Sequence, residues 1–222
     1  NHLCDHHCNC YGSGPTNLFY NRAMNLSELL AYENVSEECE LRSSFGFMAF
    51  HGGELEEMTD IIASRAAERA GASYYGIQLP DNLEWHIPSH KVTADQSPQL
   101  ASFLSHVNIV VTVHGFGRAG FFTSLLLGGR NRRLASHLGS SLRDHLPAYT
   151  IIDDIDGIPD NLRGLHQDNP VNVVEHAGVQ LELPPRVRGS SPLWWDWEGP
   201  GLTPHTERLI DALVHCATTW QH

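Results

Sequence analysis

The stretch FGFMAFHGGELEEMTDIIASRAAERAG, residues 45–71, carries the pattern from which we predict the fold class of this chain. Residues 45–50 form an apolar run that ends at His51, and two glycines behind the histidine mark a turn. Apolar residues then recur at helical spacing, at Met58, Ile61, Ile62 and Ala66. Gly71 follows them and can adopt the left-handed conformation that ends many helices. The stretch therefore predicts a strand, a loop and a helix in that order.

The rest of the chain repeats this alternation. Further strands are expected at residues 73–79, 109–113, 121–127, 149–152 and 179–183. Further helices are expected at residues 26–31, 100–107, 134–146 and from residue 204 onward. Strands that alternate with helices of this length are typical of α/β proteins with parallel strands. We predict a single-domain α/β fold with a central mixed, mostly parallel sheet and helices on both faces.

Length and composition fit one domain behind a polar extension. With 222 residues, 41% of them hydrophobic, the chain can bury one sizeable core, which we place in residues 24–222. Residues 1–23 are rich in histidine, cysteine, asparagine and glycine and lack periodicity, so we expect a disordered extension there. Its tract CDHHCNC, residues 4–10, has zinc-ligand residue types but lacks the paired spacing of a zinc finger.

Charge and residue usage exclude several kinds of partner. The 26 acidic residues outnumber the 14 basic ones and give a net charge of -12, which disfavours binding to nucleic acid. No apolar run approaches the roughly 18 residues of a membrane span, and the order typical of a signal peptide is missing. We therefore expect a cytoplasmic protein without a membrane partner. The five cysteines do not suggest a disulfide framework, whereas the 15 histidines direct attention to metal or proton chemistry.

Two histidines follow predicted strands directly. His51 ends the strand at residues 45–50, and His114 ends the strand at residues 109–113. Ligands of open α/β sheets bind at the carboxyl ends of the strands, so the two histidines are candidates for one site. A catalytic zinc needs three protein ligands and one open position. The acidic run after His51 offers the third ligand, and its spacing leaves both Glu54 and Glu56 as candidates.

Glu182 is a carboxylate inside an otherwise apolar late strand, between Leu181 and Leu183. One interpretation is an edge-strand residue that faces solvent. The other is a general base and acid, which takes a proton from a water beside the metal and later gives it to a leaving amine.

Three segments, taken together, resemble one known family. The strings FGFMAFHGGELE at residues 45–56, TVHGFG at residues 112–117 and GVQLEL at residues 178–183 are similar to the poly-γ-glutamate hydrolase family, in the same order. The resemblance implies a zinc carboxypeptidase-like fold with one Zn²⁺ ion on His51, Glu56 and His114. It also implies that Glu182 is the catalytic carboxylate.

The same resemblance gives candidate residues for substrate binding. The segments WHI at residues 85–87 and GGRN at residues 128–131 match the family and imply that His86, Arg130 and Asn131 line the substrate site. A basic residue that the family has near Asn172 is missing here. If that residue holds a substrate carboxylate, other arginines must replace it. The candidates lie near the His114 loop and the GGRN segment, and they are Arg118, Arg130, Arg132 and Arg133.

The sequence thus predicts a zinc-dependent hydrolase of amide bonds next to a carboxylate, with γ-glutamyl linkages as the first candidate. An acylamino-acid or small-peptide amidohydrolase on the same scaffold is the alternative enzyme. A metal-binding module without catalysis is the alternative from another class. Motifs for a nucleophilic serine, a phosphate loop or a dinucleotide are missing from the sequence.

Overall fold

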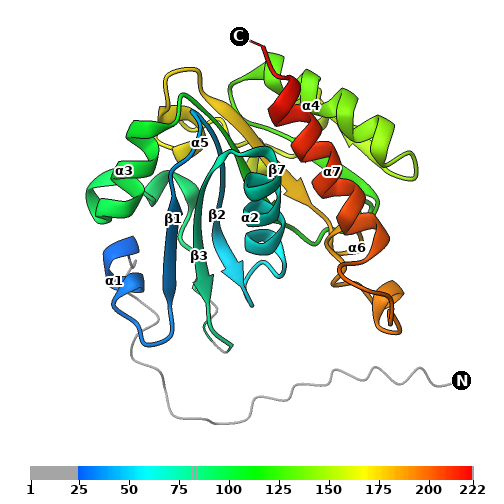
Figure 1. Cartoon of the computed structure of the whole chain (residues 1–222), viewed down its shortest axis with the longest axis horizontal. Coiled ribbons are helices and arrows are strands. Elements are labelled where there is room, and N and C mark those ends of the chain that lie inside the picture. The colour runs from blue at the N-terminus through cyan, green and yellow to red at the C-terminus, as the bar shows by residue number, and fades with distance from the viewer. Residues whose placement is uncertain (1–24, 82, 84, 222) are drawn as a thin grey trace, which may run out of the picture.

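A seven-stranded sheet with the strand order β1-β3-β2-β4-β7-β5-β6 forms the centre of the molecule (Figure 1). A computed structural model describes residues 25–81, 83 and 85–221 of the chain, so the extension expected at residues 1–23 lies outside the described residues. The strands are β1 (Ser36–Glu40), β2 (Phe45–Gly53), β3 (Ser73–Leu79), β4 (Ile109–Gly115), β5 (Ser124–Leu127), β6 (Thr150–Ile152) and β7 (Gly178–Leu183).

The sheet is mixed and mostly parallel. β2 pairs in parallel with β3 and β4, β4 with β7, and β5 with β6, whereas β1 with β3 and β5 with β7 are antiparallel. The predicted α/β sheet is therefore confirmed. Sequence periodicity did not indicate β1, because its sequence SEECE is polar and an edge strand buries few side chains. The strand expected at residues 121–127 begins only at Ser124.

Helices cover both faces of the sheet, as predicted. The α-helices are α1 (Leu26–Leu30), α2 (Thr59–Ala70), α3 (Pro98–His106), α4 (Arg132–His145), α5 (Pro170–Val173), α6 (Pro185–Arg188) and α7 (Pro204–Thr219). The short 3₁₀ turns are η1 (Ser89–Lys91), η2 (Ala94–Gln96), η3 (Ile155–Gly157), η4 (Asp160–Leu162) and η5 (Pro192–Trp194). Within the described residues, none of these helices has the length and apolar character needed to cross a bilayer.

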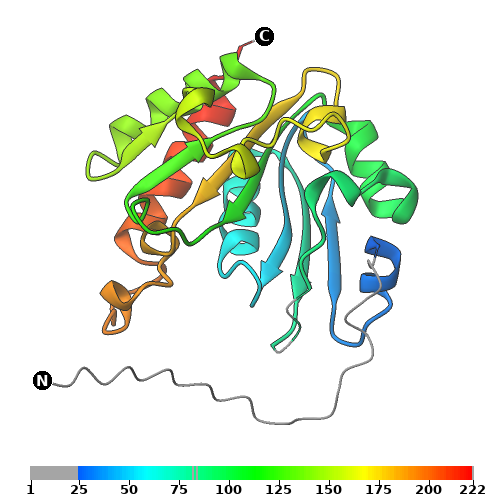
Figure 2. The ribbon, with the colours of Figure 1, turned by 180° about the vertical axis from the view of Figure 1, so that it is seen from behind.

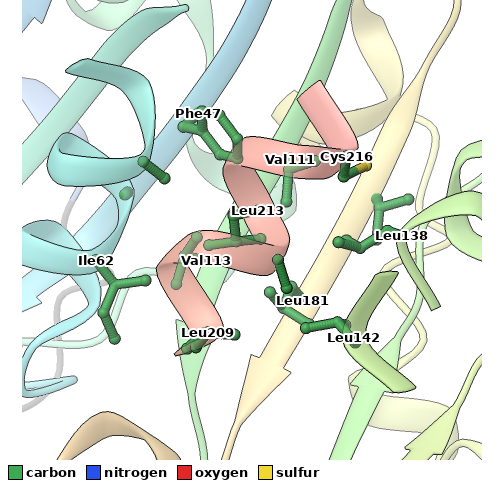
Figure 3. Close-up of a cluster of buried hydrophobic side chains, with 14 of the residues drawn as sticks. Phe47, Ile62, Val111, Val113, Leu138, Leu142, Leu181, Leu209, Leu213 and Cys216 are labelled. Carbon is green, nitrogen blue, oxygen red and sulfur yellow. The ribbon is translucent and has the colours of Figure 1, made fainter. Parts of the chain in front are cut away.

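The larger hydrophobic core lies between the sheet and α2, α4 and α7. In α7, Leu209, Leu213 and Cys216 recur at spacings of three and four residues and form one buried face. Figure 3 shows this face directed at Val113 of β4 and Leu181 of β7, with α2 and α4 on either side. The helix begins as the sequence predicts, since the side chain of Thr203 caps it and Pro204 occupies its first turn.

A second hydrophobic core lies on the opposite face of the sheet. There Leu29 of α1 and Phe103 of α3 pack with Phe50 of β2 and Tyr75 of β3. Strand side chains alternate between the two faces, which explains why β2 is apolar at every position from Phe45 to Phe50. The α2 and α7 helices lie in front of the sheet in Figure 1 and behind it in Figure 2, where the second face is turned to the viewer.

Between β2 and β4 the chain changes the side on which it crosses the sheet. The connection from β2 to β3 runs through α2 on the first face, whereas the connection from β3 to β4 runs through α3 on the second face. The strands β2 and β4 are neighbours, and the chain leaves the carboxyl end of β2 toward β3 on one side and the carboxyl end of β4 toward β5 on the other side. Such a switch point opens a crevice at the carboxyl ends of the two strands, where ligands of α/β proteins bind.

Gly53 ends β2 at this crevice with a positive φ of +73°, and a Cβ atom there would overlap the backbone carbonyl of Leu79. We expect Gly53→Ala to destabilise the protein by about 3 kcal/mol or more, since left-handed strain and overpacking add. Gly71, the C-cap of α2, has a similar φ of +65° but open space around it, so Gly71→Ala should cost only about 1 kcal/mol.

Urea unfolding of the two alanine variants measures this difference. Equal losses of unfolding free energy would show that the approach of Leu79 to Gly53 does not limit the turn.

Candidate metal centre and active-site cavity

Strand alternation turns two candidate residues toward the second face of the sheet. Val113 of β4 and Leu181 of β7 belong to the larger core on the first face. Their neighbours His114 and Glu182 therefore point to the opposite face, where they are register partners on adjacent parallel strands. Both lie at the carboxyl end of their strand and both are buried. The pairing of β4 and β7 thus brings the imidazole and the carboxylate together.

A bulge in β2 adds His51 to this group. The register between β2 and β3 shifts between Ala49 and Gly52, so that β2 holds an extra residue there. In a regular strand, neighbouring side chains point to opposite faces. Here the ring centroids of Phe50 and His51 lie 4.8 Å apart, and those of Phe50 and His114 lie 4.9 Å apart. The bulge thus directs His51 to the same face as His114, with 5.2 Å between their ring centroids.

Glu56 reaches both histidines from the loop between β2 and α2. Its Oε1 lies 2.9 Å from Nδ1 of His51, and its Oε2 lies 3.3 Å from Nδ1 of His114. The backbone N–H of Gly115 also donates to Oε2, at 2.9 Å. A hydrogen bond holds the loop against the end of β2, because the backbone N–H of Glu56 donates to the carbonyl of His51 at 2.9 Å. Ligand atoms of the three side chains all lie within 4.8 Å of one another, so they form a group that can hold a metal ion.

Glu54, the other carboxylate that the sequence leaves open as a ligand, lies outside this group. Its side chain is exposed and adjoins Asp81, whose negative charge raises the pKa of Glu54. The geometry therefore favours Glu56 over Glu54 as the third ligand.

Charge and hydrogen bonding at the triad suit a cation. Burial raises the pKa of Glu56, but the imidazoles of His51 and His114 outweigh burial and hold that pKa well below its usual range. Burial lowers the pKa of His114, yet the Glu56 carboxylate more than offsets it, and the pKa of His114 is raised. Within the described part of the chain, Nε2 of His114 is a buried nitrogen without a hydrogen-bond partner. An ionised carboxylate and imidazole nitrogens fit a divalent ion such as Zn²⁺.

A backbone contact fixes the ring of His51. Its Nε2 lies 2.9 Å from the carbonyl oxygen of Ile87. A carbonyl can only accept, so Nε2 carries a proton, and Nδ1 on the Glu56 side is the ring nitrogen left to bind a metal ion. Such outer contacts orient metal-binding histidines and set their tautomer.

Glu182 is 3% exposed and faces the triad from β7. Burial raises the pKa of its carboxyl to about 7, although the neighbouring His114 opposes the shift. The Nε2 of Gln180 donates a hydrogen bond of 2.7 Å to Oε1 of Glu182. A carboxyl group with a pKa near neutrality can both take up and release a proton, as general acid and base catalysis requires. The solvent-facing interpretation of Glu182 is wrong.

Both the triad and Glu182 line a cavity of about 420 Å³. Its other walls come from residues 86–90, which lead into η1, and from residues 160–169, which include η4. The rings of His90 and His166 meet at the junction of these two segments, with 4.6 Å between their centroids. Among the described residues that line the cavity, histidines are the basic side chains, and lysine and arginine are missing.

The sequence-predicted substrate residues divide into two groups. His86 lines the cavity, with its ring centroid 4.5 Å from that of His51. Arg118, Arg130 and Asn131 lie outside the cavity lining. Arg130 donates from Nε to the carbonyl of Leu165, and Asn131 caps α4 by accepting from the N–H of Leu134. A role of these three residues in substrate binding stays a prediction.

Arg188 is a buried residue beside the site that sequence patterns did not indicate. Its Nε donates to the carbonyl of Leu183 at 3.2 Å, and its Nη1 donates to the carbonyl of Glu57. It thereby ties the end of β7 to the loop that carries Glu56. Gly115 makes room for it, since a Cβ atom there would lie 2.9 Å from the guanidinium carbon.

Comparisons with known proteins agree with this architecture. A family model described as poly-gamma-glutamate hydrolase matches residues 22–191. A bacteriophage poly-gamma-glutamate hydrolase is structurally similar with a TM-score of 0.70 at 21% identity, covering 85% of this chain and 91% of its own. A zinc-free form of YNDL is similar with a TM-score of 0.72 at 16% identity, covering 88% and 96%. A sequence comparison with curated proteins found no match. At these identities the two structures establish a shared fold.

The neighbouring glutamates allow a matched test of the metal centre. We expect Glu56→Gln to weaken Zn²⁺ binding about 100-fold or more, because loss of an outer contact alone costs about 10- to 100-fold. Glu54→Gln removes the same charge two residues away and should leave the affinity within about twofold, since an exposed carboxylate outside the ligand set contributes little. Competition with a chelating indicator measures both affinities. A loss of affinity in the Glu54 variant with normal binding by the Glu56 variant would refute the assignment.

Proposed function

The chain belongs to the poly-gamma-glutamate hydrolase family, and from this premise we propose that it is a zinc-dependent enzyme that hydrolyses γ-glutamyl amide bonds. One observation carries the proposal: a three-residue group that can hold a metal ion and a buried carboxyl group with a pKa near neutrality face each other in one cavity. This combination is typical of metal-assisted hydrolysis.

In this proposal His51, Glu56 and His114 hold one Zn²⁺ ion. When bound there, zinc supplies Lewis-acid polarisation of the scissile carbonyl and lowers the pKa of the water beside it. The protein prepares the ligands for this role. The carbonyl of Ile87 orients His51, and the N–H of Gly115 holds Glu56.

Glu182 handles the protons of the reaction. It takes a proton from the water whose oxygen attacks the amide carbon, and it later gives that proton to the leaving nitrogen as the carbon–nitrogen bond breaks. The products are a carboxylate and an amine. The burial that raises the pKa of Glu182 also keeps its proton exchange away from bulk solvent.

For the substrate we propose a chain of γ-linked glutamate, which carries a free carboxylate beside each amide bond. His86, His90 and His166 line the cavity and can donate hydrogen bonds to such carboxylates. Arg130 lies behind the cavity wall formed by residues 160–169, where its Nε donates a hydrogen bond to the carbonyl of Leu165. We propose that Arg118, Arg130 and Asn131 contact parts of a polymer that extend beyond the cavity.

The composition of the cavity also supports a second candidate. Within the described lining, arginine and lysine are missing, and Asp160 adds a negative charge to the wall. A small acylated amino acid or short peptide carries less negative charge than the polymer and would meet less repulsion. We therefore keep an acylamino-acid or small-peptide amidohydrolase as the alternative.

Incubation of the zinc-loaded protein with poly-γ-glutamate tests the proposal. We expect the native protein and Glu54→Gln to shorten the polymer, and Glu182→Gln to lose about 10²- to 10⁴-fold in kcat, because general acid and base catalysis contributes this much. Chain length is followed by size-exclusion chromatography, with metal content measured for each variant. α-Linked polyglutamate serves as the substrate control and should stay intact.

Three other results would change the assignment. An intact polymer with cleavage of N-acyl amino acids supports the alternative substrate class. Normal zinc content without hydrolysis of either substrate supports a metal-binding module without catalysis. Equal rates for the native protein and Glu182→Gln remove Glu182 from the mechanism.

A further inference from the structure

Three buried polar side chains form a continuous hydrogen-bonded line that ends at Glu182. The backbone N–H of Val171 donates to Oδ1 of Asn169 at 3.2 Å, and Nδ2 of Asn169 donates to Oε1 of Gln180 at 2.8 Å. Nε2 of Gln180 then donates to Oε1 of Glu182 at 2.7 Å. Asn169, Gln180 and Glu182 are each at most 5% exposed, and all three line the cavity.

The backbone at the start of α5 determines the direction of every bond in this line. The N–H of Val171 can only donate, so Oδ1 is the side-chain atom of Asn169 that faces it. The amide nitrogen of Asn169 must then face Gln180, and the carbonyl oxygen of Gln180 must accept from it. The amide nitrogen of Gln180 is left to face Glu182. A reversal of either amide would place two donors or two acceptors against each other.

Packing holds the Gln180 amide in place. Gly164 in the wall segment has a positive φ of +61°, and a Cβ atom there would overlap Oε1 of Gln180. Gln180 and Glu182 are two residues apart on β7, so their side chains leave the same face of the strand side by side. The wall segment and the strand therefore confine the amide.

We propose that Gln180 is a positioning residue for Glu182 and that Asn169 fixes its orientation, an inference that rests on the proposed function. Oε1 of Glu182 always faces an N–H donor, so a proton on that oxygen would oppose the proton of the amide. The proton of Glu182 is thereby assigned to Oε2. The line from α5 selects which oxygen of the carboxyl group exchanges protons with water and with the leaving amine.

Gln180→Met keeps the length of the side chain and removes the amide. We expect kcat for poly-γ-glutamate to fall about 10- to 100-fold, as for loss of other orienting contacts, with KM and zinc content within about twofold of the native values. In the Glu182→Gln background the same substitution should cause no further loss, because the carboxyl group that it orients is gone. A similar loss in both backgrounds, or a change in KM alone, would overturn the proposal.

Asn169→Ser tests the line from its other end. Serine still caps α5 but cannot donate to Gln180 as the amide does, so the Gln180 amide loses its fixed direction. We expect a fall in kcat smaller than that of Gln180→Met and none in the Gln180→Met background. Asn25→Ser is the matched control, because Asn25 caps α1 through the same kind of side-chain bond, far from the line along the chain. Asn25→Ser should leave kcat unchanged. If the losses in kcat from Asn169→Ser and Gln180→Met add fully in the double variant, the inference is refuted.

An amide NMR spectrum separates failure of this inference from failure of the proposed function. If the native protein cleaves none of the substrates, the proposed function has failed. The ¹H–¹⁵N resonances of the Gln180 side chain still report the contact, and both Glu182→Gln and Asn169→Ser should shift them. Side-chain resonances of Gln180 that neither substitution moves would refute the hydrogen-bonded line itself.

Discussion

The parallel alignment of β2, β4 and β7 is the constraint on which the site depends. Parallel strands end at a common edge, and this edge is open between β2 and β4 because the chain leaves these two neighbouring strands in opposite directions. Alternation along β4 and β7, together with the bulge in β2, turns the polar residues at this edge to the face opposite the larger core. The helices α2 and α7 can therefore pack tightly against the sheet while the other face carries the cavity.

The burial of several ionisable groups in one place has a cost that their arrangement offsets. A buried carboxylate is unfavourable unless it is paired, and Glu56 is paired with two imidazoles and one backbone N–H. Burial raises the pKa of the Glu182 carboxyl, and within the described residues no cation makes a hydrogen bond to it. The pKa values of Glu56 and Glu182 are thus shifted in opposite directions by their surroundings. The same difference suits one of them to metal binding and the other to proton transfer.

Much of the fold and the centre of the site could be predicted from the sequence. The apolar runs located the buried strands, and the residues directly behind two of them, His51 and His114, are part of the triad. Spacing alone could not decide whether Glu54 or Glu56 is the third metal ligand, because this depends on how the loop folds back onto His51. The bulge in β2 and the burial of Arg188 have no local sequence signal, since both arise from pairing with distant segments. The cavity wall at residues 160–169 escaped prediction for the same reason, whereas His86 in the other wall was among the predicted substrate residues.

The wall formed by residues 160–169 differs in kind from the rest of the cavity. The triad and Glu182 lie on strands of the sheet or in the loop that follows β2, whereas this wall belongs to the connection between β6 and α5, whose helical segments are the short 3₁₀ turns η3 and η4. Connections of this type tolerate insertion and sequence change far better than strands do. Proteins that share this fold can therefore change the molecules they recognise by exchanging this connection while they keep the candidate metal site and Glu182. One wall of the cavity can thus change in sequence, whereas the residues on the strands at the opposite wall are constrained by the sheet.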